Sequence, residues 1–332
     1  HGAIRNGGIG NVIALGINFN DRLLVSLPLG YTWGTCQYLR EALIPGATTI
    51  VETSFDTDRL IDVLEDEKIS VWAPVVVLFE RIADSPRFRD ADFSNLRHVT
   101  TGRASLHLLK TWLAKGVRIT QSYGLTETGG HATILYVEDA EGRMGSSGRA
   151  MMGCEVRIVD EDGRDLPSGE AGEVLIRGAV VMKGYLNKPE ETARTMKNGW
   201  LWTGDIGVLD ADGFLTIVDR SKDMLRSGGL NVYPAELERV LAGVDGLEEF
   251  TVIGVNDERW GETPMIVANG TKPLDVTGLK ARAVAELADF KRPRYYVDYG
   301  KPLPRTVSGK VLKRELRLEF ETVPDHAISL KD

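Results

Sequence analysis

The sequence predicts an α/β protein with a doubly wound parallel sheet, a β-rich subdomain and a small α+β C-terminal domain. Three successive patterns along the 332 residues lead to this expectation. Short β-branched runs alternate with longer helical patterns over 21–123, short runs and tight turns fill 145–219, and a second mixture of helices and strands begins at Arg220. We therefore expect three parts, residues 1–144, 145–219 and 220–332.

The first part alternates strand and helix patterns in the order that a parallel sheet requires. Strand-like runs lie at residues 22–29, 48–52, 70–75, 96–102 and 117–124, and helical patterns lie at 38–44, 58–68, 76–84 and 106–116. In such sheets, ligands bind beyond the carboxyl ends of the strands. Two polar segments fall at such ends, TTGRASL (100–106) and SYGLTETGG (122–130).

The two later parts have different patterns. Residues 155–178 alternate apolar and polar side chains around the turn signals Asp162-Gly163 and Ser168-Gly169, which predicts antiparallel strands. After a boundary at about 220–222, helical patterns occur at 234–244, 279–290 and 310–320, and strand patterns at 250–255 and 264–270. The last part is therefore expected to fold as a separate α+β unit.

Composition excludes several classes of protein. The formal charge of −8 argues against a nucleic-acid partner, because such proteins usually carry a basic surplus. No apolar run reaches the length of about 18 residues that a membrane span needs. The two cysteines, Cys36 and Cys154, are far apart and are read as small buried hydrophobes in a reducing, cytoplasmic setting. The chain begins at His1 without a signal-peptide pattern, which is the start expected of a processed or partial product.

Four segments need a common explanation: QSYGLTET (121–128), GWLWTGD (199–205), VDRSKDMLRSGGLNVYPAELE (218–238) and PLPRTVSGKVLKRELR (302–317). Each alone is weak, and a stretch such as SYGLTETGG is more often an ordinary turn. Together, in this order and spacing, they resemble the adenylate-forming superfamily and, within it, the acyl-CoA synthetases. The resemblance implies an enzyme that activates a carboxylic acid with ATP and Mg²⁺ and transfers the acyl group to coenzyme A.

The resemblance assigns a nucleotide site. Asp205 matches the carboxylate that accepts hydrogen bonds from both ribose hydroxyls, and Tyr123 matches the aromatic ring that packs on adenine. Thr126 matches a phosphate-binding hydroxyl, and Glu127 matches the carboxylate that holds Mg²⁺. The other implied nucleotide-binding residues are Gly102, Arg103, Ala104, Gln121, Ser122, Gly124, Ile217 and Arg220.

The resemblance also implies a moving C-terminal domain. Lys310 matches a lysine that approaches the reacting carboxylate and α-phosphate, and Lys222 matches the hinge about which the domain rotates. Gly228 and Gly229 match the loop that lines the coenzyme A tunnel, although a plain turn is the alternative. The expected acyl pocket comprises Tyr31, Trp33, Gly129 and Gly130, of which the two glycines also suit a turn. His98 and His131 are expected to be structural.

The sequence departs from the superfamily at its beginning. The phosphate-gripping loop, rich in Ser, Thr and Gly and ending in Pro-Lys-Gly, has no counterpart in these residues. This departure leaves open a truncated, non-catalytic nucleotide-binding protein. Within the superfamily, the nearest alternative is an adenylation domain that loads a carrier protein. The motif SGGLNVYPAELE (227–238) favours the coenzyme A ligases. The sequence does not choose between fatty, aryl and cyclic acids, and it leaves a homodimer open.

Overall fold

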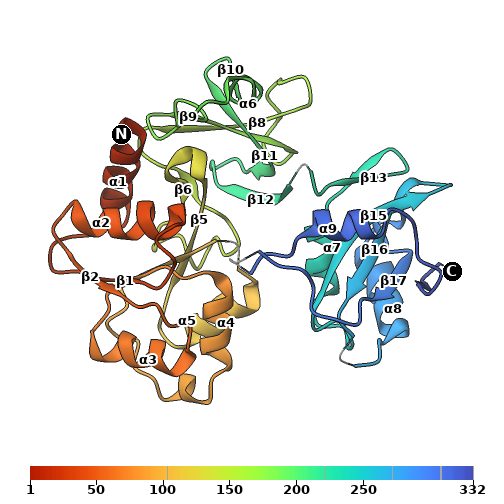
Figure 1. Cartoon of the computed structure of the whole chain (residues 1–332), viewed down its shortest axis with the longest axis horizontal. Helices are drawn as coiled ribbons and strands as arrows, with labels where there is room; N and C mark the ends of the chain where they lie inside the picture. Colours follow the sequence, from red (N-terminus) through yellow and green to blue (C-terminus); the bar gives the residue numbers. More distant parts are fainter. Residues whose placement is uncertain (103, 221, 271, 307–308, 332) are drawn as a thin grey trace. The chain divides into compact units, whose positions relative to one another are not determined.

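The computed structural model describes residues 1–102, 104–220, 222–270, 272–306 and 309–331 (Figure 1). The chain divides into two compact units. The first comprises His1–Thr203 and Gly207–Ile217, and the second comprises Gly204–Ile206 and Val218–Asp332. The finer, three-part division expected from the sequence stays a prediction.

The first unit contains a sheet of seven described strands in the order β2-β1-β3-β4-β5-β6-β7. Its strands are β1 (Arg22–Val25), β2 (Thr48–Val51), β3 (Val71–Trp72), β4 (His98–Thr101), β5 (Ile119–Leu125), β6 (Gly130–Ile134) and β7 (Arg149–Ala150). The first five are parallel, as predicted, whereas β6 and β7 are antiparallel additions that the sequence patterns did not indicate. In the order 2-1-3-4-5, the topological switch point, where ligands bind in such sheets, lies at β1 and β3.

Helices cover both faces of this sheet. Successive residues of a strand point to opposite faces, so apolar neighbours in β1 contribute to a core on each side. Leu24 belongs to a core with the helices α3 to α5, whereas its neighbours Leu23 and Val25 belong to a second core with residues of α1, η1 and α2. The helices are α1 (Gly2–Ala14), η1 (Trp33–Leu39), α2 (Arg40–Leu43), α3 (Thr57–Asp66), α4 (Val76–Asp84), η2 (Pro86–Arg89) and α5 (Leu106–Ala114). The doubly wound arrangement predicted from the sequence is therefore present.

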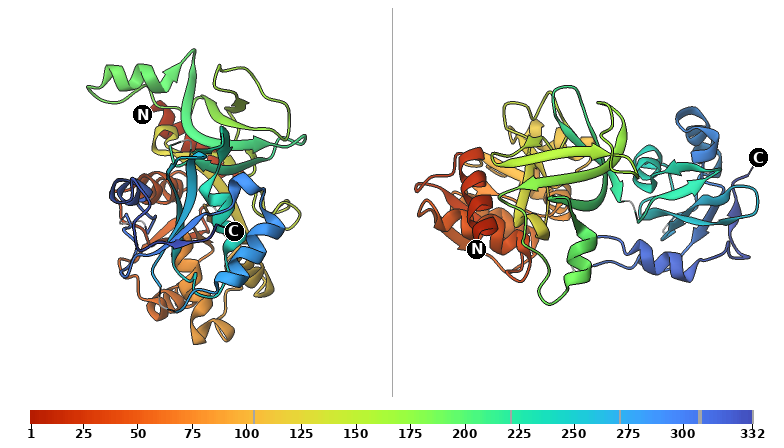
Figure 2. Two further views of the ribbon diagram at one scale, coloured as in Figure 1. Left: turned by 90° about the vertical axis from the view of Figure 1, so that its right-hand side faces the viewer. Right: turned by 90° about the horizontal axis from the view of Figure 1, so that it is seen from above.

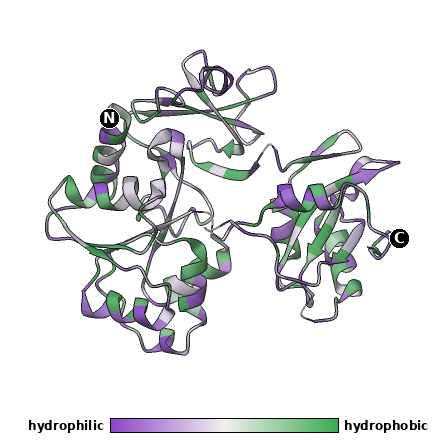
Figure 3. Ribbon diagram, viewed as in Figure 1, coloured by the Kyte–Doolittle hydropathy of each residue, from purple (hydrophilic) through white to green (hydrophobic). Residues whose placement is uncertain are grey.

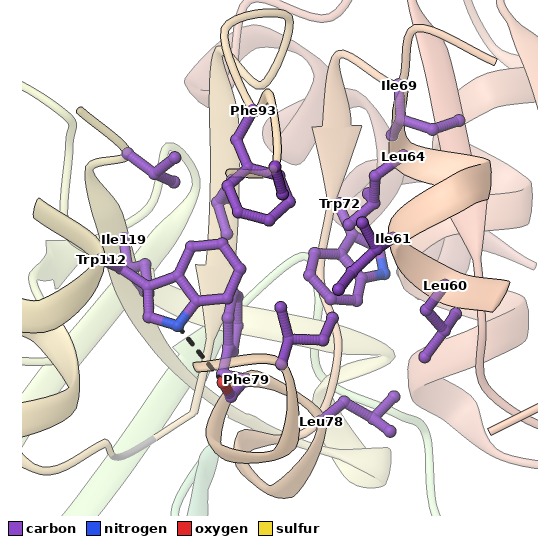
Figure 4. Packing of buried hydrophobic residues seen from close by; sticks show 14 of the residues in the cluster. Leu60, Ile61, Leu64, Ile69, Trp72, Leu78, Phe79, Phe93, Trp112 and Ile119 are labelled. Carbon is purple, nitrogen blue, oxygen red and sulfur yellow. Dashed lines mark hydrogen bonds between the residues drawn. The ribbon is translucent and has the colours of Figure 1, made fainter. Parts of the chain in front are cut away.

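Aromatic side chains fill the larger of these two cores (Figure 4). The ring centroids of Trp72 and Phe79 are 5.1 Å apart, and those of Phe79 and Trp112 are 5.0 Å apart. The buried indole N–H of Trp112 donates a hydrogen bond to the carbonyl oxygen of Phe79 at 3.3 Å. These contacts anchor α4 and α5 beneath the sheet, which fixes the loops at its carboxyl edge.

The β-rich part forms a second sheet of five described strands in the order β10-β11-β9-β8, with β12 paired to β11. Its elements are β8 (Cys154–Val159), β9 (Ala171–Gly178), α6 (Pro189–Thr195), β10 (Met196–Lys197), β11 (Trp200–Leu209) and β12 (Leu215–Arg220). β8 and β9 are antiparallel, and they are drawn as long yellow-green arrows in the right-hand view of Figure 2. A glycine with positive φ, Gly163 at 82°, turns the chain between them, as the turn signal predicted.

The second unit has its own sheet, β14-β13-β16-β17-β18 with β15 paired to β16. Its elements are β13 (Leu225–Ser227), β14 (Leu230–Val232), α7 (Pro234–Leu241), β15 (Phe250–Asp257), β16 (Gly261–Ala268), α8 (Val276–Glu286), η4 (Asp289–Lys291), β17 (Tyr295–Asp298), α9 (Lys313–Glu319) and β18 (Ile328–Ser329). β15 and β16 are mainly apolar (green in Figure 3) and contribute to one core with α7 and α8 and to another with α9. In neither unit is any described helix long and apolar enough to cross a membrane.

Candidate active site

The turn after β5 carries the most distinctive sequence of the chain. Residues Thr126–Thr128 form one 3₁₀ turn, η3, and Gly129 ends it with a φ of 58°, a value that favours glycine. The buried Thr128 hydroxyl accepts a hydrogen bond from the Leu125 amide at 2.9 Å and donates to the Gly130 carbonyl oxygen at 2.6 Å. Thr128 therefore pins the turn, a structural role that sequence reasoning did not assign.

Glu127 is held by a segment that lies far along the chain. The hydroxyl of Tyr185 donates to Glu127 Oε1 at 2.6 Å, and the amide of Met182 donates to the Glu127 carbonyl oxygen at 2.8 Å. Among the described residues, Glu127 Oε2 has no hydrogen-bond partner, and the residue is only half-buried. The carboxylate is thus oriented and still has one oxygen available.

Loops after β1 and β4 meet this turn at the carboxyl edge of the sheet. The Thr32 hydroxyl donates to the Thr126 hydroxyl oxygen at 3.1 Å. A Cβ atom at Gly102 would lie 3.5 Å from the Trp33 ring, so these two predicted site residues are in contact across the edge. Tyr31 is 43% exposed, which leaves its ring accessible from solvent.

Other predicted nucleotide-binding residues have structural partners. The buried Gln121 side chain donates to the Gly102 carbonyl oxygen at 3.1 Å and accepts from the Gly145 amide at 3.0 Å, so it braces the loop after β4. Ala104 is buried in the aromatic core, which leaves only its backbone for a ligand. Ser122 is also buried. The prediction for Arg103 lies outside the described residues, as does that for the side chain of Cys36.

The adenine-binding expectation falls on a partly apolar surface. Tyr123 and Ile217 are half-buried and pack against the same apolar cluster, that of the second sheet. Gly124 is exposed, and a Cβ atom there would lie 2.0 Å from the Gly130 carbonyl oxygen, so only glycine fits. Tyr123 and Ile217 therefore share one apolar cluster, and Gly124 follows Tyr123 on β5.

A buried polar network supports the turn from its other side. Arg40 donates to the carbonyl oxygens of Ile4 at 2.8 Å and Gly129 at 2.9 Å, and it pairs with Glu41 at 3.4 Å. Asn11 donates to the same Glu41 oxygen, Oε1. Burial raises the pKa of the fully buried Glu41 to about 8, although Arg40 and Asn11 oppose that rise. Arg40 thus ties α1 to the turn that follows Glu127.

The remaining residues near this network fit turn and core roles. Gly129 and Gly130 are buried, and the positive φ of Gly129 explains its identity, so their place in an acyl pocket stays a prediction. His131 is buried, and its pKa is lowered to about 3 by burial and by the Arg40 charge. His98 is half-buried and its pKa is lowered first by burial. Burial raises the pKa of the half-buried Cys154 thiol to about 11, which makes this thiol unreactive.

The second unit presents a separate set of charged residues. Arg220 Nε lies 3.3 Å from Oδ1 of the buried Asp205, so these two predicted nucleotide-binding residues form an ion pair. The neighbouring Asp219 accepts hydrogen bonds from the Arg220 amide at 2.8 Å and from the Ala235 amide at 2.8 Å, at the start of α7. Asp219 fixes the backbone beside Arg220, and sequence reasoning did not identify it.

The predicted hinge and the predicted catalytic lysine are each braced locally. Arg317 of α9 donates to the carbonyl oxygen of Lys222 at 2.9 Å. The Lys310 amide donates to the Thr306 hydroxyl at 3.1 Å. The pKa of the Lys310 ammonium is lowered. The first cause is partial desolvation by surrounding protein, even though the residue as a whole is exposed, and the second is repulsion by the charge of Arg220. The backbone of Lys310 is therefore tied to Thr306.

Gly228 and Gly229 connect β13 to β14 with φ values of 59° and 80°. Two consecutive positive φ values are typical of the tight hairpin turn that favours paired glycines. A Cβ atom at Gly228 would also lie 2.8 Å from the Trp260 ring. The turn explains both glycines, and their contact with coenzyme A stays a prediction.

Comparison with known proteins identifies both units. The AMP-binding enzyme family matches residues 2–186, and the AMP-binding enzyme C-terminal domain matches residues 236–310. A feruloyl-CoA synthase from Amycolatopsis sp is 37% identical over 306 residues, which are 91% of this chain and 62% of that protein.

Two solved structures of o-succinylbenzoate coenzyme A synthetase from Bacillus subtilis are each 31% identical and cover 95% of this chain. The structure with the acyl-adenylate intermediate has a TM-score of 0.88, and the structure with ATP and magnesium has a TM-score of 0.87. This chain covers 64% and 65% of them, so it spans less than two thirds of its relatives. It belongs to the AMP-binding enzymes, the adenylate-forming family that its four motifs resemble.

Proposed function

We propose that this chain is part of an acyl-CoA synthetase. In the first step, a carboxylate oxygen of the acid attacks the α-phosphorus of ATP, and pyrophosphate leaves. In the second, the thiol of coenzyme A loses its proton, its sulfur attacks the acyl carbon, and AMP leaves. The observation that carries the proposal is the oriented carboxylate of Glu127 at the carboxyl edge of the sheet, where one of its oxygens has no hydrogen-bond partner in the described part of the chain. The relatives named above, a feruloyl-CoA synthase and a synthetase bound to an acyl-adenylate, support it.

The residues of the first unit fit a magnesium–phosphate complex. Among the described residues, no group of three or more His, Cys, Asp or Glu could hold a metal by itself. Mg²⁺ commonly uses only one or two carboxylates, with phosphates and water as the other ligands, so Glu127 Oε2 is sufficient on the protein side. Thr126 accepts a hydrogen bond from Thr32 and keeps its own hydroxyl hydrogen for a phosphate oxygen. Tyr123 supplies the ring for adenine.

The residues of the second unit supply charge. Asp205 accepts hydrogen bonds from the ribose hydroxyls, and Arg220, its ion-pair partner, contacts the phosphate. Lys310 donates to the oxygens on which negative charge grows as the acyl-adenylate forms. Rotation at Lys222 then moves Lys310 away from the reacting groups. The same rotation brings in the hairpin of Gly228 and Gly229, which contacts coenzyme A. Lys310 thereby takes part only in the first half-reaction, the formation of the acyl-adenylate.

The test separates the two half-reactions. In a longer protein that contains this chain, Lys310→Ala should slow acyl-adenylate formation about 100- to 1000-fold, because a preorganised charged donor is lost. Thioester formation from a supplied acyl-adenylate should change less than about twofold, since Lys310 takes no part in it. Quench-flow with ATP, or with synthetic acyl-adenylate, times each step over a panel of fatty, aryl and cyclic acids. Lys301→Ala, a change at another exposed lysine of the same unit, is the matched control.

Each alternative gives a different result. Equal slowing of both steps by Lys310→Ala would contradict the assigned role of this lysine. Transfer to a carrier protein but not to coenzyme A would favour a carrier-loading domain, and nucleotide binding without either step would favour a non-catalytic protein. A homodimer and a cytoplasmic location stay predictions.

A further inference from the structure

Tyr185 makes a contact that the proposed chemistry has not yet used. Its hydroxyl is 2.6 Å from Glu127 Oε1, although the two residues are 58 positions apart in the sequence. An O–H···O⁻ distance of 2.5–2.7 Å is typical of a charge-assisted hydrogen bond, which is about twice as strong as a neutral one. The bond therefore restricts rotation of the Glu127 carboxylate.

The backbone around Tyr185 is itself fixed. The Tyr185 amide donates to the Thr192 hydroxyl at 2.9 Å, and that hydroxyl donates to the Lys188 carbonyl oxygen at 2.8 Å. The preceding Gly184 has a φ of 151°, and a Cβ atom there would lie 2.7 Å from the Thr192 methyl carbon. Glycine at this position lets the chain pass close to α6, so the Tyr185 ring starts from a rigid base.

The same segment grips both the main chain and the side chain of Glu127. Met182 donates to its carbonyl oxygen at 2.8 Å, and Tyr185 donates to Oε1 at 2.6 Å. A tyrosine hydroxyl is ordinarily protonated at neutral pH, so Tyr185 can donate this hydrogen bond. One oxygen of the carboxylate is thereby occupied, and Oε2 is left for a cation.

We propose that Tyr185 is a positioning residue for the magnesium ion that accompanies ATP, acting through the hydrogen bond that orients Glu127. This inference rests on the proposed function, in which Glu127 binds that ion. Carboxylates that bind metals are commonly hydrogen-bonded by a second group, and loss of that group typically lowers metal affinity about 10- to 100-fold. Tyr185 fits such a role because it contacts the carboxylate and leaves its second oxygen free.

The test is Tyr185→Phe, which keeps the ring and removes only the hydroxyl. Binding of Mn²⁺, a paramagnetic substitute for Mg²⁺, is measured by electron paramagnetic resonance with ATP present. We expect the Mn²⁺ dissociation constant to rise about 10- to 100-fold. Where acyl-adenylate forms, the Mg²⁺ concentration for half-maximal rate should rise by the same factor, while the rate at saturating Mg²⁺ changes little. Tyr136→Phe, at an exposed tyrosine of the same unit, is the matched control and should leave both values unchanged.

Glu127→Gln separates failure of the inference from failure of the proposed function. If Glu127→Gln leaves Mn²⁺ affinity unchanged, Glu127 does not bind the ion and the proposed site is wrong. If Glu127→Gln weakens binding but Tyr185→Phe does not, only the role of Tyr185 is overturned. Adding Tyr185→Phe to Glu127→Gln should cause little further loss, because the tyrosine acts through the carboxylate.

A second variant covers the case in which Tyr185→Phe fails to fold. Thr192→Val removes the hydroxyl that accepts a hydrogen bond from the Tyr185 amide, and it leaves the Tyr185 hydroxyl in place. It should weaken Mn²⁺ binding in the same direction by a smaller factor. Unchanged affinity in a folded Thr192→Val protein would then count against the inference.

Discussion

Glu41 and Glu127 are both carboxylates of the first unit, and the protein holds them in opposite ways. Glu41 is 0% exposed, shares one oxygen between Asn11 and Arg40, and has a pKa of about 8. Glu127 is half-buried, and among the residues that the structure describes its side chain has one hydrogen-bond donor, at Oε1. A strongly shifted pKa often marks a functional site, but structural networks shift pKa values too. The pKa shift of Glu41 belongs to an enclosed carboxylate, so solvent access and hydrogen-bond partners indicate its structural role better than the shift does.

The largest effect on stability is expected from Glu41→Ala. Removing the side chain takes an acceptor from the buried Asn11 and from the partly buried Arg40, and leaving a buried donor unsatisfied typically costs about 1–3 kcal/mol for each group. Urea denaturation would measure the free energy of unfolding. The exposed Glu170→Ala should stay within about 0.5 kcal/mol. A loss below about 1 kcal/mol in Glu41→Ala would show that the network is dispensable.

The next effect is a pH dependence. The pKa of Glu41 rises from 4.5 to about 8 on folding, so the unfolded chain binds fewer protons than the native protein between these values. The stability from this group is therefore fully present below pH 4.5 and lost as the pH rises to about 8. Glu41→Gln cannot titrate, so its stability relative to the wild type should improve by a few kcal/mol, to order of magnitude, from pH 5 to 8. A difference between the two proteins that is constant over this range would contradict the shift.

The smallest effect on stability is expected from Glu127→Gln. The amide oxygen can still accept the hydrogen bond from Tyr185, and the side chain is only half-buried, so the free energy of unfolding should stay within about 0.5 kcal/mol of the wild type. The same urea curves measure it. A loss comparable to that of Glu41→Ala would mean that Glu127 is a structural carboxylate and would remove the contrast between the two.

The parallel sheet could be predicted because its signal is local. Leu23, Leu24 and Val25 alternate between two cores, and such alternating strands are separated by helical patterns of ordinary length. The strands β6 and β7 could not be predicted in the same way, because they are short and follow a turn whose sequence reads equally well as a loop. Helix α1 was not predicted either. It contains Gly2, Gly7, Gly8 and Gly10, which disfavour helix by about 1 kcal/mol each relative to alanine.

Tertiary packing explains the glycines of α1. A Cβ atom at Gly8 would lie 2.6 Å from Arg40 Nε and 2.6 Å from a methyl carbon of Ile44, so the helix approaches α2 only because that side chain is missing. The residues of the candidate site also fall into two groups, those that the sequence indicates and those that only the structure reveals. The motif residues Thr126 and Glu127 are recognisable from sequence, whereas two of their supports, Arg40 and Tyr185, show no pattern because their contacts join distant segments.

The two anchors of the turn after β5 impose an order on how it can be completed during synthesis. Arg40 precedes its acceptor, Gly129, by 89 positions, whereas Tyr185 follows Glu127 by 58. At about 5–20 residues per second, the ribosome adds those 58 residues in about 3–12 s. During that interval the nascent turn has its arginine anchor but lacks the tyrosine that orients its carboxylate. If Glu127 binds magnesium as proposed, its carboxylate would be oriented for the ion only after the second sheet has begun to emerge, later than the parallel sheet on which the turn is built.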